Sequence, residues 1–342
     1  MSVMDALRRR AALSLEVFPP KTDAGMEKLC GSVLPQLYTL RPDSISCTYS
    51  PGGSDAGKNL AVLDAIRSEG CCAPVTHFPC VGNTKESASR QLQAYLDHGI
   101  RHILALRGDS SSLRADSDFP SAPALVDFIR REFGGAFTIA VAGAPEGLPD
   151  SRPLEAEIEL LKRKQDSGAD YIITRLCWDI DAFRYWLDAI RASGIQLPVE
   201  AGILPILDQA ETVGEVLSHS SAIPESLCRI IAKNWILPNP FVKDPFDADV
   251  ERKKADFRKA GLEYTVNQIH AYQACGVGGI HLRTRNRYED AALIVRESGI
   301  RNAPRSLCQC LFRNHSAGGM AHNCQLSTVN CQFASFPSDK GV

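Results

Sequence analysis

Eight short apolar runs recur along the chain at intervals of roughly 30 residues, and amphipathic segments of helical length separate them. The runs are LSLEVF (Leu13 to Phe18), SISCTY (Ser44 to Tyr49), APVTHF (Ala73 to Phe78), HILAL (His102 to Leu106), TIAVAG (Thr138 to Gly143), YIITRL (Tyr171 to Leu176), PVEAGI (Pro198 to Ile203) and GGIHLRT (Gly278 to Thr284). Fully buried parallel strands read as continuous apolar runs rather than as alternating apolar and polar residues. The pattern therefore predicts an α/β fold, a (β/α)8 TIM barrel.

The segments between the runs carry helix signals. PLEAEIELLKRKQDSGAD begins with Pro153 near its first turn, places apolar residues at helical spacing and ends at Gly168, which suits a C-cap. TKESASRQLQAYLDHGI begins with Thr84 as a candidate N-cap and stops at Gly99. Between the seventh and eighth runs the spacing is about twice the repeat, which predicts an extra helix and a Pro-rich surface loop at residues 236–249.

We expect a single catalytic domain, residues 13–300, because α/β barrels of about 250 residues fold as one domain. Residues 1–12 are then an N-terminal extension. After Gly299 the composition changes to Ser, Asn, Cys and Gly with weak periodicity, so residues 301–342 are predicted to form an irregular, Cys-rich tail.

Composition argues against several classes of protein. The formal net charge is -2, from 38 basic and 40 acidic residues mixed along the sequence, so no basic face for nucleic acid is expected. No run approaches the roughly 20 apolar residues that span a bilayer, and the start lacks the features of a secretory signal. The 12 cysteines are therefore expected to be free thiols of a cytoplasmic protein rather than a disulfide framework.

Polar residues at the ends of the apolar runs are the candidates for chemistry, because the active site of a (β/α)8 barrel lies at the carboxyl ends of its strands. They are Glu16, Thr48, His77, Arg107 with Asp109, Glu146, Arg175, and Arg283 with Arg287. Core packing alone does not explain so many polar groups at one mouth. The sequence thus predicts a polar site there.

Glu16 lies inside an apolar run, where a carboxylate is costly to bury unless it is paired or its pKa is raised. A carboxyl group with a raised pKa suits a general acid, and we expect that role for Glu16. The alternative is a structural Glu that bonds to backbone groups or to an Arg at the barrel mouth.

Arg107, Gly108 and Asp109 follow the fourth run directly. Gly lets the backbone approach a ligand closely, and Arg offers a fork of donors for phosphate or carbonyl oxygens. A turn with an internal Arg–Asp pair is the alternative. A lone His such as His77 is more often a satisfied histidine of the core or mouth than a ligand or base.

No metal site is expected in the barrel, because no second strand-end His or Cys stands at metal-binding spacing. The tail residues Cys308, Cys310, His315, His322, Cys324 and Cys331 could bind a soft metal, but their spacings match no known finger or ribbon. GxxxxGK[ST] is absent and GxGxxG does not follow the first run, so neither a P-loop nor a dinucleotide-binding fold is predicted.

The chain resembles the methylenetetrahydrofolate reductase family in eight ordered segments, from about Leu13 to Gly299. They are SLEVFPPK, CTYSPGGS, THFPCVG, GIRHILALRGD, APEGLPDS, LKRKQDSGADYIITRLCWD, AGILPI and GIHLRTRNR. The resemblance implies a barrel that holds FAD at its mouth and takes a hydride from NADH or NADPH as co-substrate. The hydride then reduces 5,10-methylenetetrahydrofolate to 5-methyltetrahydrofolate in one-carbon metabolism. The family also implies a homo-oligomer.

The resemblance assigns roles by position. Glu16 matches the family's general acid, which protonates the folate as its imidazolidine ring opens, and Asp109 matches the carboxylate that tunes pterin and flavin. The positions that match flavin contacts are Thr48, His77, Arg107, Gly108, Asp109 and Lys164, with Glu157 where the family often has Asp. Arg287 matches a position near the folate, and Arg175 replaces a folate-contacting Gln.

Several positions depart from the family pattern. Ala144 and Leu148 replace a common Tyr and His on the flavin side, which is expected to weaken FAD binding or alter its pose. Leu176 and Cys177 replace paired aromatic residues, and the cation at Arg175 favours a more anionic ligand or marks a paralogue with another substrate. Two other hypotheses stand beside the main one: a flavin-independent relative that passes hydride directly from nicotinamide to folate, and a non-catalytic barrel that binds folate or a partner protein.

Overall fold

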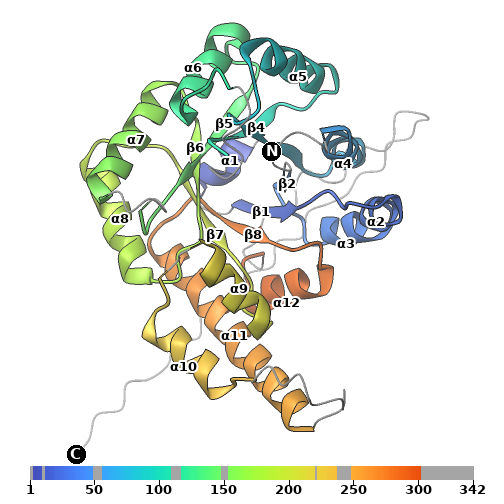
Figure 1. The fold of residues 1–342 in the computed structure, drawn as a ribbon, viewed down its shortest axis with the longest axis vertical. Helices are drawn as coiled ribbons and strands as arrows, with labels where there is room; N and C mark the ends of the chain where they lie inside the picture. The colour runs from blue at the N-terminus through green and yellow to red at the C-terminus, as the bar shows by residue number, and fades with distance from the viewer. Residues whose placement is uncertain are drawn as a thin grey trace, which may run out of the picture. The chain divides into compact units, whose positions relative to one another are not determined.

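The computed structural model describes residues 3–9, 12–48, 56–108, 117–147, 153–219, 222–236 and 248–301. Eight parallel strands close into a barrel in the order β1-β2-β3-β4-β5-β6-β7-β8 (Figure 1). The strands are β1 (Ala12–Val17), β2 (Ser44–Cys47), β3 (Ala73–Pro79), β4 (His102–Leu106), β5 (Thr138–Gly143), β6 (Tyr171–Thr174), β7 (Val199–Ile203) and β8 (Gly279–Arg283). The predicted (β/α)8 TIM barrel is confirmed.

Helices alternate with the strands and surround the barrel (Figure 1). They are α1 (Val3–Arg8), α2 (Asp23–Lys28), the π-helical η1 (Leu29–Val33), α3 (Leu34–Tyr38), α4 (Ala56–Glu69), α5 (Lys85–Asp97), α6 (Ala122–Phe133), α7 (Leu154–Asp166), α8 (Ile180–Ala192), α9 (Gln209–His219), α10 (Glu225–Lys233), α11 (Ala248–Ala274) and α12 (Tyr288–Ser298).

The predicted helix ends have the expected caps. Thr84 and Ser87 form a capping box at the start of α5, each side chain accepting a hydrogen bond from the other's backbone N–H. Pro153 is the N-cap of α7, and Gly168 follows its end with a φ of 101°. Gly299 ends α12 in the left-handed conformation.

The amino end of the barrel is closed by residues of the predicted N-terminal extension. Val3, Ala6 and Leu7 of α1 are buried in one apolar cluster with residues near the strand starts, such as Leu104 and Tyr171. At the seam between β8 and β1, a Cβ on Gly279 would lie 2.5 Å from the Cβ of Ala12. The close pairing of these strands therefore depends on glycine at this position.

The segment between β7 and β8 contains α9, α10 and α11. A regular repeat has one helix here and one extra helix was predicted, so the structure has one helix more than expected. A small apolar core of its own holds this addition, including Leu204 and Ile206 after β7, Leu227 of α10 and Phe257 of α11. Most of the predicted Pro-rich loop, residues 237–247, lies outside the described residues.

Eight cysteines fall within the described residues, and all are free thiols, as predicted: Cys30, Cys47, Cys71, Cys72, Cys80, Cys177, Cys228 and Cys275. No described helix has both the length and the apolar character required to cross a membrane. Residues 302–342 of the tail, including its cysteines and histidines, lie outside the described residues.

Candidate active site

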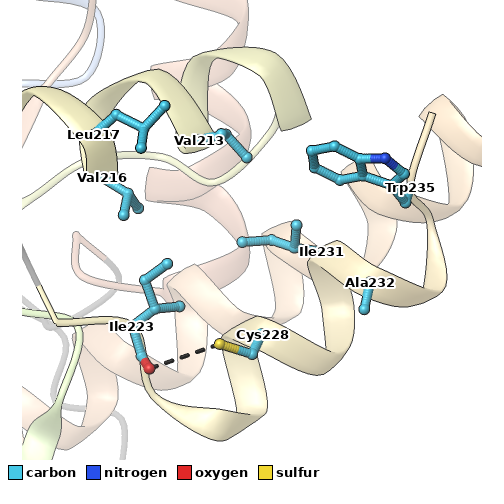
Figure 2. A pocket seen from close by; sticks show the side chains of 8 residues that line it. All are labelled: Val213, Val216, Leu217, Ile223, Cys228, Ile231, Ala232 and Trp235. Atoms are coloured by element: carbon cyan, nitrogen blue, oxygen red, sulfur yellow. Dashed lines mark hydrogen bonds between the residues drawn. The ribbon is translucent and has the colours of Figure 1, made fainter. Parts of the chain in front are cut away.

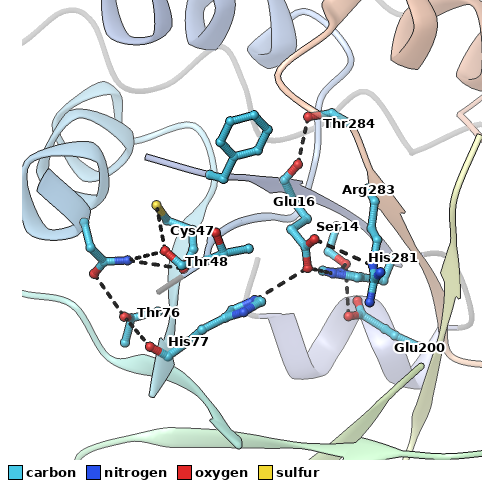
Figure 3. A network of polar contacts seen from close by, with 12 residues as sticks. Ser14, Glu16, Cys47, Thr48, Thr76, His77, Glu200, His281, Arg283 and Thr284 are labelled. Atoms are coloured by element: carbon cyan, nitrogen blue, oxygen red, sulfur yellow. Dashed lines mark hydrogen bonds and ion pairs between the residues drawn. The ribbon is translucent and has the colours of Figure 1, made fainter. Parts of the chain in front are cut away.

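Polar side chains gather inside the barrel around Glu16 (Figure 3). They are Ser14 and Glu16 from β1, His77 from β3, Glu200 from β7, and His281 and Arg283 from β8. Alternate residues of a strand face the same side of a sheet, so each pair two positions apart shares the interior. The strand register places Ser14 beside His281 and Glu16 beside Arg283.

Glu16 is surrounded by three basic side chains. His281 Nε2 lies 3.2 Å from Glu16 Oε2, and Arg283 Nε lies 3.6 Å from Oε1. His77 Nε2 lies 3.7 Å from Oε2, which is too long for a hydrogen bond. In Figure 3 the two histidine rings approach the carboxylate from opposite sides.

The expected raised pKa of Glu16 is wrong for this structure. Burial by itself raises the pKa, but Arg283, the hydrogen bond with His281 and the neighbouring His77 outweigh burial. The net result is a pKa of Glu16 well below its usual range. The sequence revealed the apolar strand around Glu16 but not the cation that the next-door strand brings beside it.

His77 behaves as a neutral group. Burial lowers the pKa of His77 to about 4, although the Glu16 carboxylate opposes this shift. At neutral pH the attraction between Glu16 and His77 is therefore that of a charge and a neutral ring. Arg283 is the permanent cation beside Glu16.

A second carboxyl group, Glu200, lies deeper in the barrel and is only 1% exposed. Its Oε2 lies 3.0 Å from Ser14 Oγ, and the same hydroxyl lies 2.7 Å from His281 Nδ1. Burial raises the pKa of Glu200 to about 7, and His281 and Ser14 only partly offset this effect. A continuous line of contacts thus joins Glu200 to Glu16 through Ser14 and His281 (Figure 3).

Glu200, Ser14 and His281 were not predicted as site residues, because they lie inside the apolar runs rather than at their ends. A signal was present in the alternation. Polar residues two positions apart inside an otherwise apolar run, such as Ser14 with Glu16 and His281 with Arg283, must face the same side of the sheet. A polar interior could have been inferred from these pairs.

We expect Glu200→Gln to stabilise the protein in a pH-dependent way. The folded pKa of Glu200 lies above its unfolded value, so the wild type loses stability as pH rises from about 4.5 through 7. The variant should gain up to about 3 kcal/mol over the wild type at pH 8 and almost nothing at pH 4.5. Denaturant unfolding of both proteins across this range measures the difference.

The difference between the two proteins is the informative quantity, because other buried groups titrate in the same window. His77, whose folded pKa is lowered, gives a slope of the opposite sign in both proteins. A stability difference that stays constant with pH would show that Glu200 is ionised in the folded protein throughout.

A cavity of about 490 Å³ opens at the barrel mouth beside Glu16. It is lined by Glu16, Val17, Phe18, Thr48, Leu204, Glu211, Glu215, Arg283, Arg285 and Arg287. Arg287, predicted to bind substrate, pairs with both oxygens of Glu211, and Arg285 lies 2.6 Å from Glu215. An anionic ligand would therefore have to compete with carboxylates that already hold these guanidinium groups.

The loop after β8 has an unusual backbone. Arg285 and Asn286 both have positive φ values, 52° and 57°. Asn286 Nδ2 donates to Phe18 O at 2.9 Å, and its Oδ1 accepts from Phe18 N at 3.1 Å. These two bonds tie the β8 loop to the end of β1, so the loop carrying Arg285 and Arg287 is held against the strand carrying Glu16.

The predicted flavin-side residues form a second group. Glu157 and Lys164 of α7 are buried: Glu157 Oε1 accepts from Ala144 N at 2.9 Å, and Lys164 Nζ donates to Ala142 O at 2.6 Å. Burial raises the pKa of Glu157 and lowers that of Lys164, and each group partly offsets the shift of the other. The structure thus brings both residues to the end of β5.

The other predicted site residues occupy the strand ends. Thr48 lines the mouth cavity, Arg107 is exposed after β4, and Gly108 has a φ of 87°. Arg175 follows β6, and its positive charge acts on Glu157. Asp109 and Leu148 lie outside the described residues.

Glu146 connects two segments that lie outside the strands. Its Oε2 accepts a hydrogen bond from Ala222 N at 3.0 Å, which ties the end of β5 to the segment before α10. Burial raises the pKa of Glu146, and the bonds to Ala222 and Cys177 oppose the shift.

A second cavity, of about 560 Å³, lies between α9 and α10 (Figure 2). Its lining is apolar and includes Leu217 and Trp235, which are 78% and 41% exposed. The described residues of its lining include no carboxylate, His, Lys or Arg, so the polar site at the barrel mouth is the candidate for chemistry.

The amino-acid sequence matches a known protein family over most of its length. A sequence model described as methylenetetrahydrofolate reductase matches residues 3–299. The chain belongs to the methylenetetrahydrofolate reductase family. The resemblance carried by the eight ordered segments is thereby confirmed.

Named members of the methylenetetrahydrofolate reductase family align with most of the chain. Methylenetetrahydrofolate reductase 1 of Schizosaccharomyces pombe is 29% identical over 297 residues, covering 86% of this chain and 47% of its own. The 5,10-methylenetetrahydrofolate reductase of Escherichia coli is 27% identical over 291 residues, covering 84% and 91%. The chain thus spans about half the length of the eukaryotic relative and most of the bacterial one.

A solved structure shares the fold of this methylenetetrahydrofolate reductase family member. It is an uncharacterized protein from Clostridium thermocellum that binds two copies of 5-methyl-5,6,7,8-tetrahydrofolic acid. The TM-score is 0.55 at 13% sequence identity, over 88% of this chain and 99% of that chain. At this identity the likeness shows the fold alone.

Proposed function

We propose that this chain reduces 5,10-methylenetetrahydrofolate to 5-methyltetrahydrofolate, with NADH or NADPH as the electron donor and FAD as the bound carrier. The observation that carries the proposal is the Glu16 carboxyl group, which lines the mouth cavity at the carboxyl end of β1. Family membership and the names of the relatives support the same reaction.

Glu16 is the residue proposed to supply the proton. Opening of the imidazolidine ring requires a proton on a ring nitrogen, and a carboxylic acid within reach of the cavity can provide it. Glu16 Oε2 also contacts His281, so the carboxyl group is oriented from within the barrel while it faces the cavity. After the transfer, Arg283 and His281 stabilise the carboxylate that remains.

Arg285 and Arg287 are proposed to receive the anionic end of the folate. Both line the mouth cavity, and the cations are held in place by Glu211 and Glu215. A ligand carboxylate can exchange with these partners because Arg binds carboxylates through a planar fork of donors. This exchange would cost part of the binding energy of the new contact.

The described residues fit a flavin in two respects. Gly108 has a φ of 87°, and a Cβ there would lie 3.0 Å from Val81 Cγ2, so the turn after β4 requires a residue without a side chain. Glu157 Oε2 is buried and has no hydrogen-bond partner among the described residues, so it can accept a bond from a ligand. When bound, FAD would accept a hydride from the nicotinamide and pass it to the folate. The residues proposed to hold it are Thr48, His77, Arg107, Gly108, Asp109, Glu157 and Lys164.

One observation favours a second candidate, direct hydride transfer from nicotinamide to folate. Ala144 stands at the end of β5 with its N–H held by Glu157, and its small side chain offers no aromatic face to a flavin. Leu148 likewise offers no hydrogen bond. A protein without a flavin would be expected to use the same Glu16.

The experiment is a visible absorption spectrum of the purified protein, followed by anaerobic addition of NADH or NADPH and then of methylenetetrahydrofolate. We expect a flavin band that the nicotinamide bleaches and the folate restores. A colourless protein that oxidises the nicotinamide only when folate is present would favour direct transfer. If protein supplied with FAD reduced no folate with either nicotinamide, the proposed function would be wrong.

A further inference from the structure

Glu16 is held as a carboxylate, so the proton that it would deliver to the folate must come from another group. Arg283 and His281 favour the carboxylate, yet the proposed reaction consumes one proton for each hydride. An exposed carboxyl group could take this proton from water. The Glu16 side chain is only 16% exposed. Towards the barrel interior, hydrogen-bond contacts connect it to the carboxyl group of Glu200.

The four groups of Glu200, Ser14, His281 and Glu16 can be hydrogen-bonded to one another in two complete ways. In the first, a protonated Glu200 Oε2 donates to Ser14 Oγ, Ser14 donates to His281 Nδ1, and His281 Nε2 donates to the Glu16 carboxylate. In the second, every bond is reversed, and the proton is on Glu16 Oε2. Both arrangements use the same three contacts, and in both the two carboxyl groups share a single negative charge.

We propose that Glu200 stores the proton that Glu16 delivers, and that Ser14 and His281 pass it between the two carboxyl groups. This inference rests on the proposed function for the delivery to folate. The O–H bond at Glu200 breaks, each of the two intermediate groups gives one proton and takes one, and an O–H bond forms at Glu16. Glu16 then gives this proton to the folate. A proton from solvent afterwards enters at Glu16 and returns to Glu200 by the same contacts.

The surroundings of Glu200 suit a group that stores a proton rather than a member of a structural ion pair. No Lys or Arg lies within ion-pair distance of Glu200 among the described residues, and its Oε1 has no hydrogen-bond partner there. The negative charge of Asp43 disfavours a second negative charge on Glu200. Asp43 is held by Arg301, and His281 is the basic group that faces Glu200 directly. Burial raises the pKa of Glu200 to about 7, so near neutral pH this carboxyl group can both bind and release a proton.

The storage of the proton is tested without folate by infrared spectroscopy of the protonated carboxyl groups between pH 5 and 9. We expect the wild type to lose one carboxylic-acid C=O band as pH rises through about 7, and Glu200→Gln to lack this band at every pH. Ser14→Ala should shift the band, because Ser14 Oγ is the contact of Glu200 Oε2. A wild type without such a band, or the same titration in Glu200→Gln, would overturn the proposal.

The kinetic test uses the full-length protein in single turnovers of folate reduction between pH 6 and 8.5. Glu200→Gln and Ser14→Ala should each slow this step by about 10- to 100-fold and remove the ionisation near pH 7 from its pH profile. Ser14→Thr keeps the hydroxyl and should restore both. Ser46→Ala is the matched control, since the Ser46 hydroxyl is buried in β2 and has no hydrogen-bond partner among the described residues.

The two tests separate the failure of this inference from the failure of the proposed function. Wild-type rates and an unchanged pH profile in Glu200→Gln would overturn the relay while folate reduction stands. If the wild type reduced no folate, the proposed function would fall, and the carboxylic-acid band would still decide whether Glu200 holds a proton near pH 7.

Discussion

Replacement of Glu16 by Gln is expected to slow folate reduction by about 100- to 10,000-fold, the range typical of a lost general acid. Gln keeps the size of the side chain and can still contact His281, but it has no proton to give. Reduction of the protein by the nicotinamide requires no such proton donor, so this first half-reaction should continue near the wild-type rate. Measuring the two half-reactions separately in a stopped-flow instrument makes the comparison.

The first half-reaction also serves as the control for folding, because a collapsed site would lose both steps. The variant should be less stable than the wild type at neutral pH. The lowered pKa of Glu16 means that its charged form stabilises the fold above the unfolded pKa of about 4.5, and Gln removes this contribution. Folate turnover at the wild-type rate in a folded variant would exclude Glu16 as the acid.

The barrel could be predicted from the sequence because strands buried on both faces leave a strong mark. β4 and β5 have the same bounds as the runs that predicted them, His102 to Leu106 and Thr138 to Gly143. Local signals also sufficed for the helix ends, since the Thr84 cap depends only on residues within one turn. Features determined by neighbouring residues in the chain were therefore predictable.

The chemistry of the site was less predictable, because it depends on which strands lie side by side. Glu16 was found as a carboxyl group in an apolar strand, but the sign of its pKa shift depends on Arg283, which is far along the chain and adjacent only after the barrel closes. The role of Glu200 could not be predicted for the same reason. Its role depends on Ser14 and His281, which β1 and β8 bring to it.

The site also depends on how α11 packs behind the mouth. Gly261 lies where α11 crosses the segment after β7, and a Cβ there would be 1.8 Å from Ile206 O. Thr265, one turn on, accepts a hydrogen bond from Ile206 N at 3.1 Å and donates to Gly261 O at 2.8 Å. The helix and the segment are thus in backbone contact, and Leu204 in the same segment lines the mouth cavity.

Gly261→Ala is therefore expected to destabilise the protein by about 3 kcal/mol, because the methyl group meets a backbone carbonyl that cannot turn aside. The matched control is Gly214→Ala in α9, where a Cβ would meet nothing within 4 Å. There Ala should stabilise the protein by about 0.5 to 1 kcal/mol through its better helix propensity. Both substitutions change the unfolded chain in the same way, so opposite signs in denaturant unfolding would isolate the contact with Ile206. Equal gains in both variants would mean that α11 can move away from the β7 segment at little cost, and the position of Leu204 at the mouth would then not depend on this packing.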